Sequence, residues 1–307
     1  MTIADDLTPN PNRFATAPVT PQSVTPALPC VLRWRQGQLW VSSVVRGRDI
    51  PLPALGSSEW FRACLGKSKV TVVCIDPALG TDVISCWATA CKEANKSLYL
   101  RIPASPLSPA KQKPLAWAVK RGCDRIAAAL LLTVLSPIML LIVGLIKLQD
   151  RGPVLATQWR VGERGRMFRV FNFRATVADG QAPLPQSGIK APETEPVLTV
   201  LGQVLKQTHL DKLPLLFNIL RGELSLVGPH PWTIYETLVL PAKMRTRLHT
   251  LPGITGTLQN FVHFPMANPK LIQQVTLQDL HYLGQWSLRK DLQQLTATTL
   301  ELLDHTL

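Results

Sequence analysis

The longest apolar stretch of the chain runs from residue 126 to residue 146 and contains 21 residues without a charged side chain. An uninterrupted apolar run of about 18 residues or more can cross a bilayer, whereas a helix on a protein core needs only one apolar stripe. Ser136 and Pro137 lie near its centre. Proline removes a backbone hydrogen bond and clashes with the preceding turn. The pattern therefore predicts a membrane helix over residues 117–150 that is kinked or broken at Ser136 and Pro137.

Two arms of about ten residues, each about 15 Å long, are too short to cross a hydrocarbon core about 30 Å thick. Both ends of the run carry basic residues, which gather on the cytoplasmic side of membranes. These are Lys120, Arg121 and Arg125 before the run, and Lys147, Arg151, Arg160 and Arg164 after it. We predict a re-entrant, monotopic helix in the inner membrane, with the soluble parts in the cytoplasm. A bitopic helix that tolerates its proline is the alternative. The hydroxyls of Thr133 and Ser136 can satisfy the carbonyls that Pro137 frees.

Before the membrane segment, two short apolar runs flank a segment whose apolar residues have the spacing of an α-helix. Residues 69–76 are typical of a buried parallel strand, residues 81–94 of a helix, and residues 97–102 of a second strand. This βαβ pattern predicts a small Rossmann-like α/β domain over residues 30–102. Its first turn has one glycine where a dinucleotide site needs three, so we interpret Asp76 as a capping or turn residue.

Proline-rich segments border this domain. Residues 1–29 hold few large apolar side chains and predict a disordered tail, without the basic and apolar regions of a secretory signal. Residues 103–116 predict a stiff basic linker. Past the membrane segment, residues 151–307 predict a mainly α-helical domain on the bilayer surface, with a mobile loop over residues 178–196. Its expected helices cover residues 199–208, 211–221, 233–249 and 287–303. The fold class is α/β overall.

A net charge of +13 indicates a partner that bears phosphate groups. The chain shows no helix-turn-helix, zinc-finger or RNA-binding signature, which argues against nucleic acid. The six cysteines form no C-x-x-C pair and have no regularly spaced histidines beside them. We interpret them as free thiols in a reducing compartment and not as metal ligands.

Several motifs follow the membrane segment in a fixed order. They occupy residues 158–162, 168–174, 210–214, 218–231 and 252–256, and the chain closes with Tyr282-x3-Trp286-Ser287-Leu288-x2-Asp291. In this order, directly after a Ser-Pro-broken apolar helix, they resemble the bacterial sugar transferases. These are the monotopic phosphoglycosyl transferases that begin exopolysaccharide assembly. The resemblance covers about residues 117–307.

The resemblance implies transfer of a phosphosugar from a nucleotide-sugar, usually a UDP-sugar, to polyprenyl phosphate at the membrane. It makes Asp211 the nucleophile and a ligand of Mg²⁺. It also implies substrate binding by Arg174, Lys206, Asn218, Glu223, His230 and Gln259. Read without the resemblance, Asp211 is a good helix N-cap. In that reading Arg174 and Glu223 are solvated surface charges, and His230 is a turn residue between two prolines.

The chain departs from the family pattern around Asp211. Lys212 stands where the family has the metal-binding glutamate, which removes an oxygen ligand and should weaken Mg²⁺ binding. Lys212 can instead neutralise phosphate charge and favour the ionised form of Asp211, which gives it a catalytic role. Arginine is replaced by Lys206 and His230, and lysine by Asn172. Lysine and neutral histidine cannot form the bidentate hydrogen bonds to phosphate that arginine forms.

The leading prediction is a polyprenyl-phosphate phosphoglycosyl transferase, or a divergent glycosyl transferase of the same family. One alternative is a catalytically degenerate homologue that acts as a membrane scaffold or regulator of glycan assembly. Another is a basic membrane-surface protein that does no chemistry, which explains the charge but not the ordered motifs. The expected partners are a nucleotide-sugar, polyprenyl phosphate and membrane lipid, and the sequence is compatible with a homo-oligomer.

Overall fold

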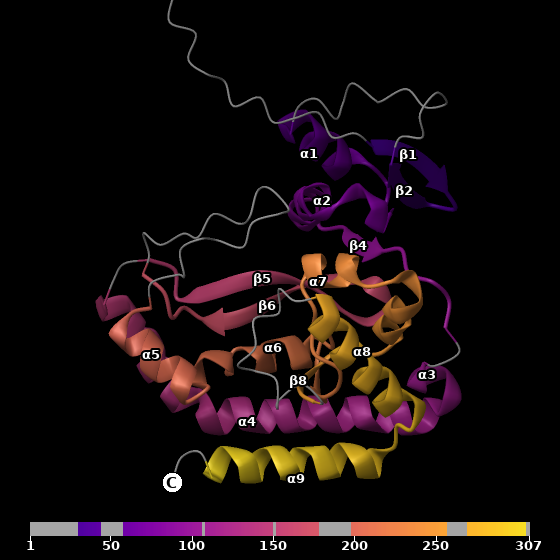
Figure 1. Ribbon diagram of the computed structural model, residues 1–307. Helices are drawn as coiled ribbons and strands as arrows, with labels where there is room; N and C mark the ends of the chain where they lie inside the picture. Colours follow the sequence, from indigo (N-terminus) through magenta and orange to yellow (C-terminus); the bar gives the residue numbers. More distant parts are fainter. Residues whose placement is uncertain are drawn as a thin grey trace, which may run out of the picture.

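The computed structural model describes residues 30–43, 58–105, 108–149, 152–177, 198–256 and 269–304. The predicted tail, the predicted loop over residues 178–196 and Gln259 lie outside these ranges. The described chain combines helices with small sheets, which confirms the mixed α/β class (Figure 1).

The N-terminal unit is built on one four-stranded sheet. Its strands are β1 (Cys30–Arg35), β2 (Gln38–Ser43), β3 (Val72–Ile75) and β4 (Ser97–Leu100), in the spatial order β1-β2-β3-β4. Strands β2, β3 and β4 are parallel, and α2 (Thr81–Glu93) crosses between β3 and β4. The predicted βαβ unit is therefore confirmed. Asp76 caps the short helix η2 (Pro77–Leu79) by accepting a hydrogen bond from Ala78 N at 2.9 Å, which confirms its capping role.

The N-terminal unit packs directly on the rest of the chain. Trp87 of α2 is fully buried in a hydrophobic cluster that also contains Val161, Met167, Ile234 and Leu248. Figure 1 shows α2 and β4 lying above the hairpin of β5 (Leu155–Val161) and β6 (Met167–Phe173). One continuous apolar core therefore joins the two parts.

The segment after β4 leads through a short helix, α3 (Pro109–Gln112), into the long apolar helix α4 (Pro114–Gln149). Helix α4 continues through Pro137. Of the two predicted alternatives, a kink or a break at Pro137, the break into two separate arms is therefore wrong. The reason is local. The Ser136 hydroxyl donates to the Thr133 carbonyl at 2.8 Å, the carbonyl whose helical partner Pro137 cannot supply. The predicted role of the Ser136 hydroxyl is confirmed.

Helix α4 has one face against the protein and one bare apolar face. Near its middle, Ala128 packs with Leu216 and Ile219, and toward its end Ile142 and Ile146 pack with Phe173 and Leu205. The outward face exposes large apolar side chains: Ile126, Leu130, Val134, Leu140, Leu141 and Leu148. A soluble protein rarely exposes an apolar surface of this extent. The helix is also long and apolar enough to cross a membrane, so the structure is consistent with membrane association.

The remaining elements complete the body of the protein on which α4 packs. The parallel pair β7 (Ser225–Val227) and β8 (Gly253–Thr255) lies near its middle, and α8 (Pro269–Gly284) leads into α9 (Leu288–Asp304) below it (Figure 1). Helix α5 (Val200–Gln207) and α9 confirm two predicted helices. The predicted helix over residues 233–249 is wrong as one element. It is divided by Pro241 into α7 (Ile234–Val239) and the 3-10 helix η5 (Ala242–His249).

Candidate active site

Asp211 lies in η4 (Leu210–Lys212), a short 3-10 turn between α5 and α6 (Leu215–Leu220). His209 adopts a left-handed conformation, with φ of 57°, and turns the chain sharply out of α5. Leu210 and Leu213 belong to a cluster with Phe173, Leu205, Ile142 and Ile146. These two leucines therefore fix the turn against β6 and α4 on either side of Asp211.

One oxygen of the Asp211 carboxyl has no hydrogen-bond partner. This atom, Oδ1, is buried. The cap of η4 is His209 and the cap of α6 is Pro214, and neither helix has a side-chain cap bond. The interpretation of Asp211 as a helix N-cap is therefore wrong. An unsatisfied buried polar atom costs about 1–3 kcal/mol, so its retention indicates a use other than folding.

Cations surround Asp211. Burial raises the pKa of the carboxyl above its ordinary value, and Lys212, His209 and Lys206 oppose that shift. Among the described residues, neither Lys206 nor Lys212 forms an ion pair. Lys206 and Lys212, which the sequence predicted as site residues, therefore lie near the Asp211 carboxylate. Neither lysine forms an ion pair with it.

His230 lies in the Gly228–Pro231 loop beside this turn. Burial lowers the pKa of His230 well below its ordinary value, and the charges of Arg160, Arg247 and Lys212 lower it further. The ring is therefore neutral at pH 7. Two arginines hold the loop through its backbone: Arg247 donates to the His230 carbonyl at 2.5 Å, and Arg160 to the Pro231 carbonyl at 3.0 Å.

The glycines of two motifs let this loop and β8 meet. A Cβ atom on Gly253 would lie 2.1 Å from the backbone nitrogen of Gly228, and one on Gly256 would lie 2.1 Å from the Gly228 carbonyl oxygen. No side chain fits at either position. The contact of the two backbones therefore accounts for the glycines in both motifs and fixes the loop that carries His230.

Arg174 follows directly after β6, and its backbone N donates to Val154 O at 2.9 Å. The residue is only 8% exposed. It is therefore not a solvated surface charge, which was the interpretation of Arg174 when the family resemblance was set aside. Its neighbour Phe173 packs in the same cluster as Leu210 and Leu213. This places the Arg174 backbone at the end of β6 where η4 packs.

Asn218 and Glu223 hold α6 against β6. The Asn218 amide donates to Arg169 O and to Glu223 Oε2, both at 2.7 Å, and its oxygen accepts from Phe171 N at 3.2 Å. Asn218 is fully buried. Its amide is enclosed and already engaged, so it positions α6 against β6. Substrate contacts by Asn218 and Glu223 stay predictions.

An apolar cavity of about 590 Å³ lies beside the Asp211 turn. Its walls include Ser136 and Met139 of α4, Phe173 of β6, and Pro214 and Phe217 after η4. It therefore extends from Ser136 of the apolar helix to Pro214, three residues after Asp211 in the chain. Such a lining suits a hydrocarbon chain.

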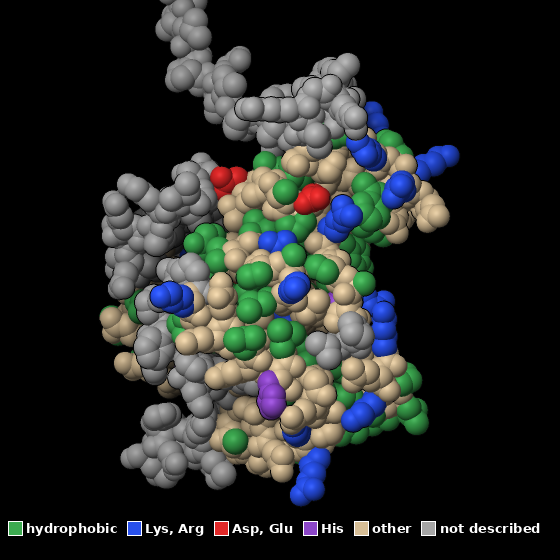
Figure 2. Space-filling view, turned by 45° about the vertical axis from the view of Figure 1, so that its right-hand side comes forward, with side chains coloured by type: hydrophobic (Ala, Val, Ile, Leu, Met, Phe, Trp, Pro, Cys, Tyr) green, Lys and Arg blue, Asp and Glu red, His purple; other side chains and the backbone are tan. Residues whose placement is uncertain are grey.

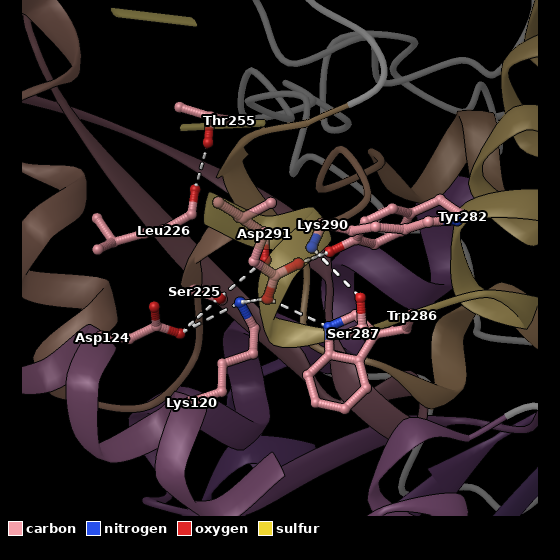
Figure 3. Close-up of polar contacts among 11 residues, drawn as sticks. Lys120, Asp124, Ser225, Leu226, Thr255, Tyr282, Trp286, Ser287, Lys290 and Asp291 are labelled. Carbon is pink, nitrogen blue, oxygen red and sulfur yellow. Dashed lines mark hydrogen bonds and ion pairs between the residues drawn. The ribbon is translucent and has the colours of Figure 1, made fainter. Parts of the chain in front are cut away.

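A buried charged network, which the sequence analysis missed, fixes the first turns of α4 (Figure 3). Lys120 Nζ lies 2.6 Å from Asp291 Oδ2 and 3.8 Å from Asp124 Oδ2. Asp291 also accepts hydrogen bonds from the Tyr282 hydroxyl and from Trp286 Nε1. Burial raises the pKa of Tyr282, and the Asp291 carboxylate raises it further, so the phenol stays protonated. The closing sequence motif therefore ties α9 to α4. Its signal in the sequence was a lysine and an aspartate four residues apart at the start of an apolar helix.

The protein surface is basic over a wide area. Figure 2 shows lysine and arginine side chains scattered from the N-terminal unit to the lower end of the molecule, with few acidic side chains on this face. The distribution agrees with the net charge of +13. A bare apolar helix and a carboxylate among cations are together typical of an enzyme that acts on phosphate-bearing substrates at a membrane.

The chain belongs to the bacterial sugar transferase family, whose model matches residues 115–305. Its members are phosphoglycosyl transferases, and the resemblance drawn from the motifs is confirmed. The chain is 30% identical to a UDP-glucose:undecaprenyl-phosphate glucose-1-phosphate transferase of Caulobacter vibrioides over 254 residues, which cover 76% of this chain and 94% of that protein. It is 33% identical to the exopolysaccharide production protein ExoY of Sinorhizobium fredii over 192 residues, which cover 59% of this chain and 83% of that protein.

The residues around Asp211 do not fit a protein-built Mg²⁺ site. Mg²⁺ prefers several oxygen ligands in an octahedron. Here the neighbours that act on the carboxyl are Lys206, His209 and Lys212, which repel a cation or offer it no oxygen. Across the described residues, no group of three or more histidine, cysteine, aspartate or glutamate side chains could hold a metal.

Proposed function

We propose that this protein transfers a sugar 1-phosphate from a UDP-sugar to undecaprenyl phosphate on the cytoplasmic face of the inner membrane, as the first step of exopolysaccharide synthesis. The observation that carries the proposal is the Asp211 carboxyl, whose buried oxygen has no partner and which lies among cations beside an apolar cavity. The names of the relatives supply the substrate classes.

In the proposed reaction, an Asp211 carboxylate oxygen attacks the phosphorus that bears the sugar. The new O–P bond forms an acyl phosphate, the bridging P–O bond breaks, and UMP leaves with the bond electrons. A phosphate oxygen of the polyprenyl acceptor then attacks the same phosphorus and regenerates the carboxylate. Lys206 and Lys212 stabilise the negative charge that gathers on the phosphate oxygens, and Arg174 holds the diphosphate from the end of β6.

The apolar cavity gives the acceptor its place. We propose that the first isoprene units of polyprenyl phosphate lie along Ser136, Met139 and Phe173, and that the phosphate end faces the Asp211 turn; the apolar lining supports this position. Because both substrates are bound at the same site, the reacting phosphate groups are held close together before the reaction, which lowers the entropic part of the barrier.

Product analysis tests this function. The purified protein in nanodiscs, supplied with undecaprenyl phosphate and a panel of UDP-sugars, should release UMP. Release of UDP would indicate direct glycosyl transfer without a phosphosugar intermediate. Absence of release and of UDP-sugar binding with every sugar would favour the alternative of a catalytically degenerate scaffold.

The pH dependence of turnover should depend on Lys212. Asp211 attacks only when ionised, so activity falls as the pH drops through its pKa, which burial has raised. Lys212 lowers that pKa. Lys212→Met should therefore move the acid limb of the kcat/KM profile to higher pH and reduce the plateau. Lys243→Met, at an exposed position in η5, is the matched control and should leave the profile unchanged. An acid limb in the same place in Lys212→Met would show that Lys212 does not act on the nucleophile.

Both ends of α4 should lie on the cytoplasmic side. Ala128 and Ile146 contact the same body of the protein from different parts of the helix, which supports a monotopic arrangement. Cysteines placed at Leu115 and Thr157, both exposed, should react with an impermeant maleimide from the cytoplasmic side only. Labelling from opposite sides would establish a bitopic helix.

The topology experiment requires that the exposed native cysteines be replaced first. Exposed Cys64 and Cys123 are replaced by serine. Burial raises the pKa of Cys30 to about 11 and that of Cys91 to about 12, and it also raises the pKa values of Cys74 and Cys86, so the four remaining thiols stay protonated and unreactive. A cysteine at exposed Lys67 in the N-terminal unit reports the cytoplasmic side.

A further inference from the structure

A second cavity, which we call the junction cavity, lies where the N-terminal unit meets the transferase part. Its volume is about 280 Å³. Its polar walls come from Tyr99 of β4, Trp117 and Arg121 of α4, and Glu163, Arg164 and Arg166 of the β5–β6 turn. The volume is near the lower end of the range for small-molecule sites, about 300–1,000 Å³.

The junction cavity is separate from the Asp211 site. It lies at the start of β6, whereas η4 packs at the end of that strand, about 20 Å away at about 3.3 Å per residue. It also includes Gly222 and Glu223, just after α6, whereas Asp211 precedes α6. A ligand in one site therefore does not occupy the other.

The cavity presents one buried hydrogen-bond donor without a partner and two exposed arginines at its mouth. Trp117 is 5% exposed, and its indole Nε1 is buried without a partner. Arg164 and Arg166 form no ion pair or side-chain hydrogen bond with the described residues. The acidic side chains in the walls are already engaged, because Glu163 lies 3.5 Å from Arg121 and Glu223 accepts from Asn218. A buried indole N–H without a partner, two exposed arginines without an ion pair and a net positive lining suit an anion that is rich in acceptors.

The backbone of Arg164 points to the same conclusion. The turn from Glu163 to Arg166 has positive φ at both central residues, 56° at Arg164 and 77° at Gly165. Such hairpin turns favour asparagine, aspartate or glycine at the first central position, and arginine is strained there. At Gly165, a Cβ atom would lie 2.3 Å from the Leu100 carbonyl oxygen, so the turn is pressed against β4. The packing of this turn against β4 keeps Arg164 in the wall of the cavity despite the strained backbone.

We propose that the junction cavity is a second anion site, which binds the phosphate group of a soluble phosphomonoester or of a lipid headgroup. The indole of Trp117 and the guanidinium groups of Arg164 and Arg166 donate to the phosphate oxygens. Because β4 and the β5–β6 turn both line the site, the ligand joins the N-terminal unit to the transferase part. This inference does not depend on the transferase reaction.

Hydrogen exchange of the whole protein in phosphatidylcholine nanodiscs tests the proposal. Glycerol 3-phosphate or inorganic phosphate should slow exchange in residues 98–101 and 160–168, and glycerol should not. Repeating the measurement with phosphatidylglycerol in the nanodisc and no soluble phosphate distinguishes the two sources. Protection with either source supports the site, and protection with neither overturns it. Protection of residues 205–215 by a UDP-sugar is a separate readout, so failure at one site leaves the other interpretable.

Two variants separate binding from folding. Arg164→Gly relieves the strained turn, so it should raise the melting temperature. It also removes one guanidinium group, so the phosphate concentration that gives half-maximal protection should rise at least about tenfold, the loss expected for one charge-assisted hydrogen bond. Arg166→Ala should weaken phosphate protection similarly. Arg289→Ala, which removes an exposed arginine on α9, is the matched control and should change neither. Unaltered protection in both cavity variants would contradict the site.

Discussion

Asp211→Asn should reduce turnover by at least about 1,000-fold, to the background of the assay, because an amide cannot attack phosphorus to form an acyl phosphate. Folding should not suffer. The ionised carboxyl is disfavoured where it lies, since burial raises its pKa and its Oδ1 has no hydrogen-bond partner. A neutral amide therefore removes a small destabilisation. UMP release and thermal unfolding, measured on the same preparation, check the two parts.

The matched control is Asp82→Asn, an aspartate-to-asparagine change at an exposed position in the first turn of α2. It should keep both the rate and the melting temperature. Turnover above about a tenth of the wild-type rate in Asp211→Asn would rule out Asp211 as the nucleophile.

Asp291→Ala should destabilise the protein by about 3–5 kcal/mol, because it leaves the Lys120 ammonium buried with only Asp124 at 3.8 Å to balance it. The same change removes the acceptor of the Tyr282 hydroxyl and Trp286 Nε1. The start of α9 should then separate from α4. Denaturant or thermal unfolding in detergent measures the loss.

An exposed ion pair provides the comparison. Arg62 and Glu93 lie 3.3 Å apart with side chains 45% and 49% exposed. Glu93→Ala should cost at most about 1 kcal/mol, since solvent screens such pairs. The double change Lys120→Met and Asp291→Leu should recover part of the stability lost in Asp291→Ala, because it removes the Lys120–Asp291 ion pair as a unit, while buried Asp124 keeps the hydrogen bond from the Ser225 hydroxyl. Equal losses from Glu93→Ala and Asp291→Ala would show that the network does not stabilise the fold.

The sequence predicts elements whose pattern is local. The apolar run of α4, the βαβ unit and helices α5 and α9 follow from periodicity and capping alone. The continuity of α4 at Pro137 did not follow, because it depends on a hydroxyl bond from Ser136 that competes with the effect of proline. The sequence did not predict the β5–β6 hairpin, because Arg164 occupies a turn position where asparagine or glycine is usual and would have indicated the turn.

The candidate site shows the same division. Motif order selected Asp211, Lys212 and His230, and the structure brings these three together. It could not show that Asn218 is enclosed, because burial depends on how α6 packs on β6. Nor could it pair Lys120 with Asp291, since these residues are far apart in sequence and meet only when α9 returns to α4.

Trapping the covalent intermediate tests the central claim most directly. The protein is incubated with its UDP-sugar in nanodiscs that lack polyprenyl phosphate, quenched and analysed by intact-mass and peptide mass spectrometry. We expect one added sugar phosphate per chain on the peptide that contains Asp211, an equal amount of UMP, and loss of the adduct when undecaprenyl phosphate is added. Turnover with no adduct on that peptide, or an adduct that persists in Asp211→Asn, would contradict the role of Asp211 as the nucleophile.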